Sequence, residues 1–152
     1  PTNNSPPATC DTGTNTQKGY LAFDATIDES FQDHWILPTG FTGAIDGHFR
    51  WKGAAITGAA GWCMQLIRVA DGATSDPAFP AQAAANCVSD TAKGTTLQEN
   101  TATITGVTCT SCVAGDHVYV RISRDADGLA VTDDMAGDGL LLTYGRTIRV
   151  AH

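Results

Sequence analysis

Short stretches in which apolar and polar residues alternate dominate the chain from Gly19 onward. The clearest covers residues 117–123, where Val118, Val120 and Ile122 are separated by polar or aromatic residues. Alternation with a period of two is typical of a β-strand with one face toward a core. We therefore expect these three aliphatic side chains to be buried and the residues between them to face outward.

Other segments with similar patterns predict further strands. They cover residues 20–24, 31–37, 45–51, 61–69, 84–89, 101–105, 140–144 and 147–150. Turn sequences such as Asp-Gly and Pro-Thr-Gly separate them, and the helix-favouring stretches are short. Strands at this spacing without helices between them predict an all-β domain, a two-sheet antiparallel β-sandwich.

Residues 1–18 have a different composition. They contain three prolines and almost no apolar residues, so they cannot bury enough surface to offset the entropy lost on ordering. We expect an extended N-terminal arm over 1–18, outside a sandwich formed by 19–152. The interpretation we favour is that this arm contacts another subunit, and the alternatives are a tail that touches nothing and one that folds back along its own domain.

The net charge of −7 and the sequence pI of about 4.7 argue against nucleic acid as a partner, because the phosphate backbone would repel such a surface. The apolar runs are much shorter than the ~20 residues that a membrane-spanning helix needs. No nucleic-acid binding and no membrane insertion are expected.

The five cysteines favour disulfide bonds over a metal site. Cys109 and Cys112 form a single C-x-x-C motif, and a structural zinc site would need a second pair or suitably spaced histidines. A bridge between these two is one candidate, and Cys63 with Cys87 is a longer one. Cys10, in the arm, is then left for an inter-subunit contact. Disulfides indicate an extracellular or virion-surface location.

The segment 124–138 is rich in carboxylates. Asp125, Asp127, Asp133 and Asp134 are candidates for a Ca²⁺ site, since Ca²⁺ prefers six to eight oxygen ligands. The run does not match an EF-hand loop, because Leu129 occupies the fifth position. We favour the interpretation of a solvated loop with Asx turns, and expect no other cofactor.

No catalytic arrangement emerges from the sequence. Asp24, Asp28 and Glu29 are more typical of a turn than of a glycosidase pair. The histidines, at positions 34, 48, 117 and 152, have no ligand-like spacing, and exposed strand positions explain them most simply. An open alternative is that His34 and His48 face each other on paired strands. The chain is therefore not expected to be an enzyme.

The three tryptophans raise the question of carbohydrate stacking, because an exposed aromatic ring can pack against a sugar. Trp51 and Trp62 lie within predicted strands, where large aromatic residues are usually core. We expect both to be buried and retain Trp35 as a candidate for ligand stacking.

Four segments, taken in order, resemble a domain recurrent in tailed-bacteriophage structural proteins of tails, fibres and decorated heads. They are FDATIDES (23–30), the Leu37-Pro38 turn, GWCMQL (61–66) and HVYVRISRDADG (117–128). Gly61 departs from the pattern, which has an aliphatic residue before the tryptophan. The resemblance implies a jelly-roll-like sandwich that assembles on a virion as a trimer or larger ring, without catalytic residues.

The leading hypothesis is therefore a virion structural protein, a capsid decoration, fibre or tail module that acts by binding subunits and surfaces. One alternative is a secreted carbohydrate-binding or adhesin domain that recognises surface glycans. The other is an extracellular filament subunit whose arm adds a strand to the sheet of its neighbour.

Overall fold

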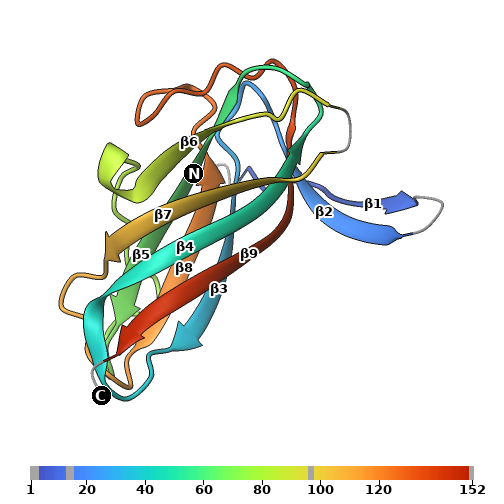
Figure 1. The fold of residues 1–152 in the computed structure, drawn as a ribbon. Coiled ribbons are helices and arrows are strands. Elements are labelled where there is room, and N and C mark those ends of the chain that lie inside the picture. Colours follow the sequence, from blue (N-terminus) through green and yellow to red (C-terminus); the bar gives the residue numbers. More distant parts are fainter. Residues whose placement is uncertain (1–3, 13–15, 96–97, 151–152) are drawn as a thin grey trace.

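The computed structural model describes residues 4–12, 16–95 and 98–150, which fold into two antiparallel sheets (Figure 1). The strands are β1 (Ala8–Thr12), β2 (Gln17–Phe23), β3 (Ser30–Ile36), β4 (Phe41–Gly53), β5 (Ala59–Val69), β6 (Cys87–Thr91), β7 (Asn100–Thr108), β8 (His117–Arg124) and β9 (Gly139–Val150). One 3₁₀ turn, Ala84–Asn86, is the helical element of these residues. No helix in the described ranges is long and apolar enough to span a membrane. The predicted all-β sandwich is confirmed.

The strand order is that of a jelly roll. One sheet has the order β1-β2-β9-β4-β7 and the other β3-β8-β5-β6. Apart from β1, eight strands divide four and four between the sheets, and the chain repeatedly crosses from one sheet to the other. Strands distant in sequence, such as β2 and β9, therefore become neighbours.

The C-terminal part differs from the sequence prediction. Residues 140–144 and 147–150 were expected to form two strands, but β9 runs through Gly145 without a turn. The register with β4 shifts between Arg50 and Trp51, which pair with Thr143 and Leu141, so Leu142 is an extra residue. A bulge of this kind lets a strand bend and stay paired.

The core lies between the two sheets and is rich in aromatic rings. Trp62 contacts Phe23 edge-on at 5.3 Å between ring centroids, and Trp51 lies 5.8 Å from it. Trp51 and Trp62 are fully buried, as are Val118, Val120 and Ile122. These core predictions are confirmed, and the period of two along β8 is the pattern that the packing requires.

At least one disulfide was expected, and both candidate bridges are present. Cys63 and Cys87 lie directly opposite each other on β5 and β6, and both are buried. Cys109 and Cys112 close the turn that follows β7. Cys10 is exposed and has a free thiol.

The N-terminal arm is extended but folds back on its own chain. β1 pairs with β2 from Ala8↔Leu21 to Thr12↔Gln17, and Ser30 N–H donates to the Asn4 carbonyl at 2.9 Å. Figure 1 shows the β1–β2 hairpin projecting from the side of the sandwich. The arm expected to lie outside the domain is therefore the edge of one sheet, and its contact with another subunit stays a prediction.

The buried face of β8 gives a direct test of the register. Val120→Asp should unfold the domain, because an unpaired carboxylate in this fully buried position costs several kcal/mol. Thr105→Asp, on an exposed strand position, should change the melting temperature little. Thermal unfolding followed by circular dichroism measures both, and equal melting temperatures would show that Val120 is not in the core.

Candidate functional site

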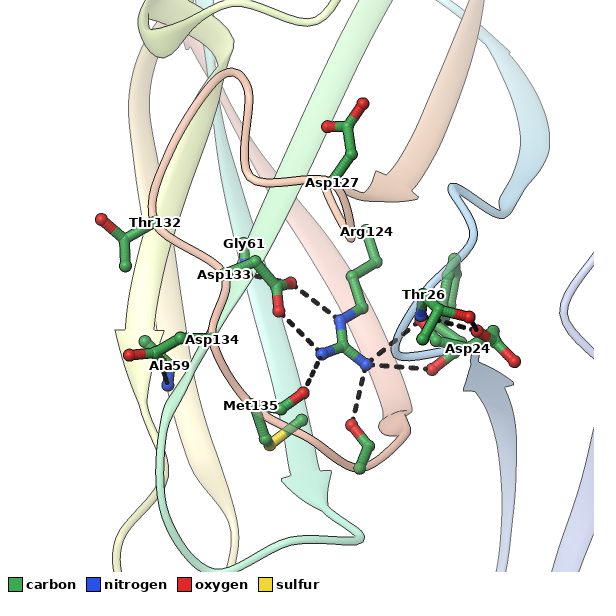
Figure 2. Close-up of polar contacts among 12 residues, drawn as sticks. Asp24, Thr26, Ala59, Gly61, Arg124, Asp127, Thr132, Asp133, Asp134 and Met135 are labelled. Carbon is green, nitrogen blue, oxygen red and sulfur yellow. Dashed lines mark hydrogen bonds and ion pairs between the residues drawn. The ribbon is translucent and has the colours of Figure 1, made fainter.

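Arg124, at the end of β8, is fully buried and all its N–H donors are used (Figure 2). Its Nε and Nη2 bond the two carboxylate oxygens of Asp133 at 2.8 Å each. The remaining donors reach backbone oxygens at 2.8 to 3.3 Å, those of Phe23, Asp24, Met135 and Gly137. A two-point pair of this kind is the geometry for which guanidinium is suited.

Asp133, the partner of Arg124, and its neighbour Asp134 hold the loop 125–138 against β5. Asp133 also accepts from Gly61 N–H at 2.9 Å, and Asp134 accepts from Ala59 N–H at 2.7 Å. A Cβ on Gly61 would lie 2.9 Å from Val131 Cγ2, so the glycine before Trp62 is required by the loop that packs on it. Asp133 and Asp134, two of the Ca²⁺ candidates, therefore make contacts that hold the fold together, and Asp133 is buried, which differs from the solvated loop that the sequence favoured.

The buried Arg124–Asp133 pair predicts that two carboxylate substitutions differ strongly in their effect on the free energy of unfolding. Asp133→Asn should destabilise the protein by about 3–5 kcal/mol, because it leaves the Arg124 charge buried without a counter-ion. Glu99→Gln, which removes a partly exposed pair with Lys18, should cost about 1 kcal/mol or less. Urea unfolding of both variants tests this, and equal losses would contradict the role assigned to Arg124.

Three carboxylates converge beside this loop. Asp28, Asp125 and Asp127 have oxygen atoms within 4.8 Å of one another, and Asp125 is fully buried. Burial, followed by the charge of Asp127, raises the pKa of Asp28, and burial raises the pKa of Asp125. With its amide nitrogen turned toward them, Gln82 lies 3.0 Å from Asp28 Oδ2 and 3.2 Å from Asp125 Oδ1. Among the described residues, this trio is the group whose oxygen ligands could hold Ca²⁺.

The raised pKa of Asp28 has a consequence for stability. A carboxyl whose pKa is higher in the folded than in the unfolded state favours folding below its ordinary pKa and opposes it as pH rises through the raised value. Asp28→Asn should therefore raise the melting temperature at pH 7 in chelator-treated buffer, and the gain should shrink toward about pH 3–4. Asp71→Asn, in an exposed loop, is the control. A lower melting temperature for Asp28→Asn at pH 7 would contradict the conclusion that burial and the charge of Asp127 disfavour the ionised Asp28 side chain.

The outer faces of the two sheets differ. Chain segments cover much of the four-stranded sheet: Phe79 packs on Arg121 at 5.0 Å, Gln82 bonds Ser123, and β5 is buried from Ala59 to Leu66. The outer face of the five-stranded sheet carries polar side chains that alternate with the core residues of the same strands. It presents Lys18, Tyr20, Asp46, His48, Arg50, Thr101, Thr103, Thr105, Thr143, Thr147 and Arg149, and Lys52 lies on the same side of the sheet but is buried.

Cross-strand contacts order this open face. His48 lies within hydrogen-bond distance of the hydroxyls of Thr103 and Thr147, at 3.3 and 2.9 Å. At the end near the hairpin, Lys18 bonds Glu99, and the Lys52 amine lies 4.9 Å from the centre of the Tyr20 ring. The face therefore holds hydroxyl, imidazole, carboxylate and cationic groups on a rigid sheet, with a tyrosine at one end.

Two candidates from the sequence lie elsewhere than expected. Trp35 is buried, and the guanidinium of Arg146 lies 4.0 Å from its ring centre, so no ring face is free to stack on a ligand. His34 and His48 lie in different sheets. His34 instead meets His117, with Nδ1 and Nε2 separated by 3.0 Å. This pairing could not be predicted from the sequence, because 83 residues separate the two histidines.

An open apolar pocket of about 490 Å³ lies between the projecting hairpin and β9. β2 pairs with β9 only over Leu21–Phe23, so the strands diverge beyond this point and leave a notch between them. Leu21, Phe31, Leu142 and Tyr144 line it, together with Cys10. The pocket is large enough for one or two apolar side chains of another molecule.

Comparison with known proteins finds no matching family model and no matching curated sequence. Among solved structures, the chain is similar to the carbohydrate-binding module TmCBM61, determined in complex with β-1,4-galactotriose. The TM-score is 0.45 and the identity 12%, over 97% of this chain and 92% of the other. A likeness of this extent does not carry a ligand from one protein to the other.

Proposed function

We propose that the protein is an extracellular binding module that recognises a carbohydrate chain on the outer face of its five-stranded sheet. The observation that carries the proposal is the contrast between the two sheets, one largely covered by its own chain and the other open and polar. Two disulfides support an oxidising, extracellular setting.

The chemistry of the open face suits sugar hydroxyls. A hydroxyl both donates and accepts, and the face offers hydroxyls along β7 and β9, with Arg50 and His48 between them on β4. Neighbouring strands are about 4.7–4.9 Å apart, so a chain of sugars lying across them would meet a new row of polar groups at each strand. Tyr20 adds an aromatic ring at the hairpin end.

The charge of the face favours an acidic glycan. Four of the nine Lys and Arg residues lie on it, namely Lys18, Arg50, Lys52 and Arg149. Lys18 and Arg149 are paired with Glu99 and Asp46, and Lys52 is buried with contacts of its own, so Arg50 is the cation that is most accessible to a ligand. Arg50 is 4.0 Å from Glu99 and mostly exposed, so it is placed to bind a carboxylate or sulfate group of a sugar.

A glycan array with neutral and acidic oligosaccharides tests this function. We expect binding to an acidic chain, weakened about tenfold by Arg50→Ala through loss of a charge-assisted bond. Tyr20→Ala should also weaken it. Lys93→Ala removes an exposed cation outside this face and should leave the affinity unchanged. Binding that Arg50→Ala and Tyr20→Ala leave intact would contradict the proposed surface.

A second candidate function, attachment to another subunit as in a virion or filament, is supported by the projecting β1–β2 hairpin. Its apolar pocket holds an exposed free thiol at Cys10, and β1 is an open sheet edge, to which a partner strand can pair.

If the β1–β2 hairpin attaches the protein to another subunit, the protein should form an oligomer that depends on Cys10 or on the apolar pocket. In non-reducing buffer we expect a covalent oligomer that Cys10→Ser abolishes, and a non-covalent one that Leu142→Asp weakens. Analytical ultracentrifugation of the two variants beside the wild-type protein measures both. A monomer in every case would leave the glycan-binding face as the functional surface.

A further inference from the structure

We propose that His34 and His117 form a binding site for a late first-row transition-metal dication such as Zn²⁺ or Ni²⁺. The ligand atoms are His34 Nδ1 and His117 Nε2. This site lies on the four-stranded sheet and is independent of the carbohydrate face and of the hairpin.

The separation of the two nitrogens carries the inference. Metal–imidazole bonds are about 2.0–2.1 Å long, so two nitrogens in adjacent coordination positions lie about 2.9–3.4 Å apart. The observed separation is 3.0 Å. At this distance one ring donates a proton to the other, and a metal ion would replace that hydrogen bond from a position to one side of the line between the two nitrogens, where both bonds reach about 2.0–2.1 Å.

The strand pairing fixes this geometry. β3 and β8 pair with His34 opposite Tyr119 and Ile36 opposite His117, so the two histidines are diagonal neighbours on one face. The Tyr119 ring lies 4.7 Å from that of His117 and 5.7 Å from that of His34, which limits the rotation of both rings. Bringing the nitrogens together therefore needs little further ordering when a metal binds.

The surroundings leave room for the remaining ligands. His34 is exposed, and the second nitrogen of each ring makes no hydrogen bond within the described part of the chain, so it can keep its proton in water. Water would complete the coordination shell. Imidazole favours Zn²⁺, Ni²⁺ and Cu²⁺, whereas Ca²⁺ and Mg²⁺ require oxygen ligands. The occupied site would link the edge strand β3 to β8.

Isothermal titration with ZnCl₂ and NiCl₂ tests the proposal on the tag-free full chain. Cys10→Ser serves as the background, since a free thiol also binds Zn²⁺. We expect saturable binding that His34→Gln and His117→Gln each weaken at least about tenfold. His48→Gln, on the other sheet, is the matched control and should bind like the background protein. CaCl₂ should give no signal that depends on either histidine.

Nitrogen-15 NMR of the histidine side chains gives a second readout that names the atoms. Zinc should shift the Nδ1 resonance of His34 and the Nε2 resonance of His117, while leaving those of His48 in place. Equal zinc affinities for the His34, His117 and His48 variants would overturn the proposal, as would the absence of binding at about 1 mM zinc.

Discussion

The buried guanidinium of Arg124 is the constraint on which much of this fold depends. A charge without solvent must be paired and must have every donor satisfied, and here one carboxylate and four carbonyl groups do so. These partners come from the end of β2, the turn that follows it and the loop before β9. Arg124 therefore fixes where β2 ends and how β9 begins. The FDAT and RDAD segments, on which the resemblance to a phage structural domain rests, meet at this position, where Arg124 bonds the main-chain oxygens of Phe23 and Asp24.

The position of the loop 125–138 also determines which sheet face remains accessible to a ligand. The loop 125–138 and the segment around Phe79–Gln82 lie on the four-stranded sheet, where Gly61 has no room for a side chain. On the five-stranded sheet most of the outward side chains of the described strands are exposed or half-buried, and Lys52 is the buried exception. The two sheets thus differ in how much of their outer face is covered. The contacts that stabilise the loop on one sheet leave the outer face of the other open. The histidine pair occupies a part of the other sheet that the covering segments leave exposed.

The sequence was sufficient for those features that depend on local pattern. Alternation along β8 identified Val120 as core, and the strand positions of Trp51 and Trp62 identified them as buried. Features that depend on register could not be predicted, because a shift of one residue reverses which side chains face each other. The meeting of His34 with His117 and the entry of Asp28 into the acidic trio are of this kind. β1 was missed because its composition of Thr, Asp and Cys has no apolar alternation, and it is held by main-chain bonds to β2.

The distribution of charged residues over the two sheets bears on which ligands the protein can bind. Eight of the sixteen Asp and Glu residues fall in the segments 24–29 and 125–138, around Arg124, whereas the five-stranded face gathers four of the nine Lys and Arg residues. A protein with a net charge of −7 thus presents a locally basic surface on one sheet and concentrates its acidic groups beside the other. An anionic ligand would be repelled by most of the surface and attracted to one face. Such a field orients the encounter and raises its rate more than it raises affinity, so binding to this face should weaken and slow as salt concentration rises.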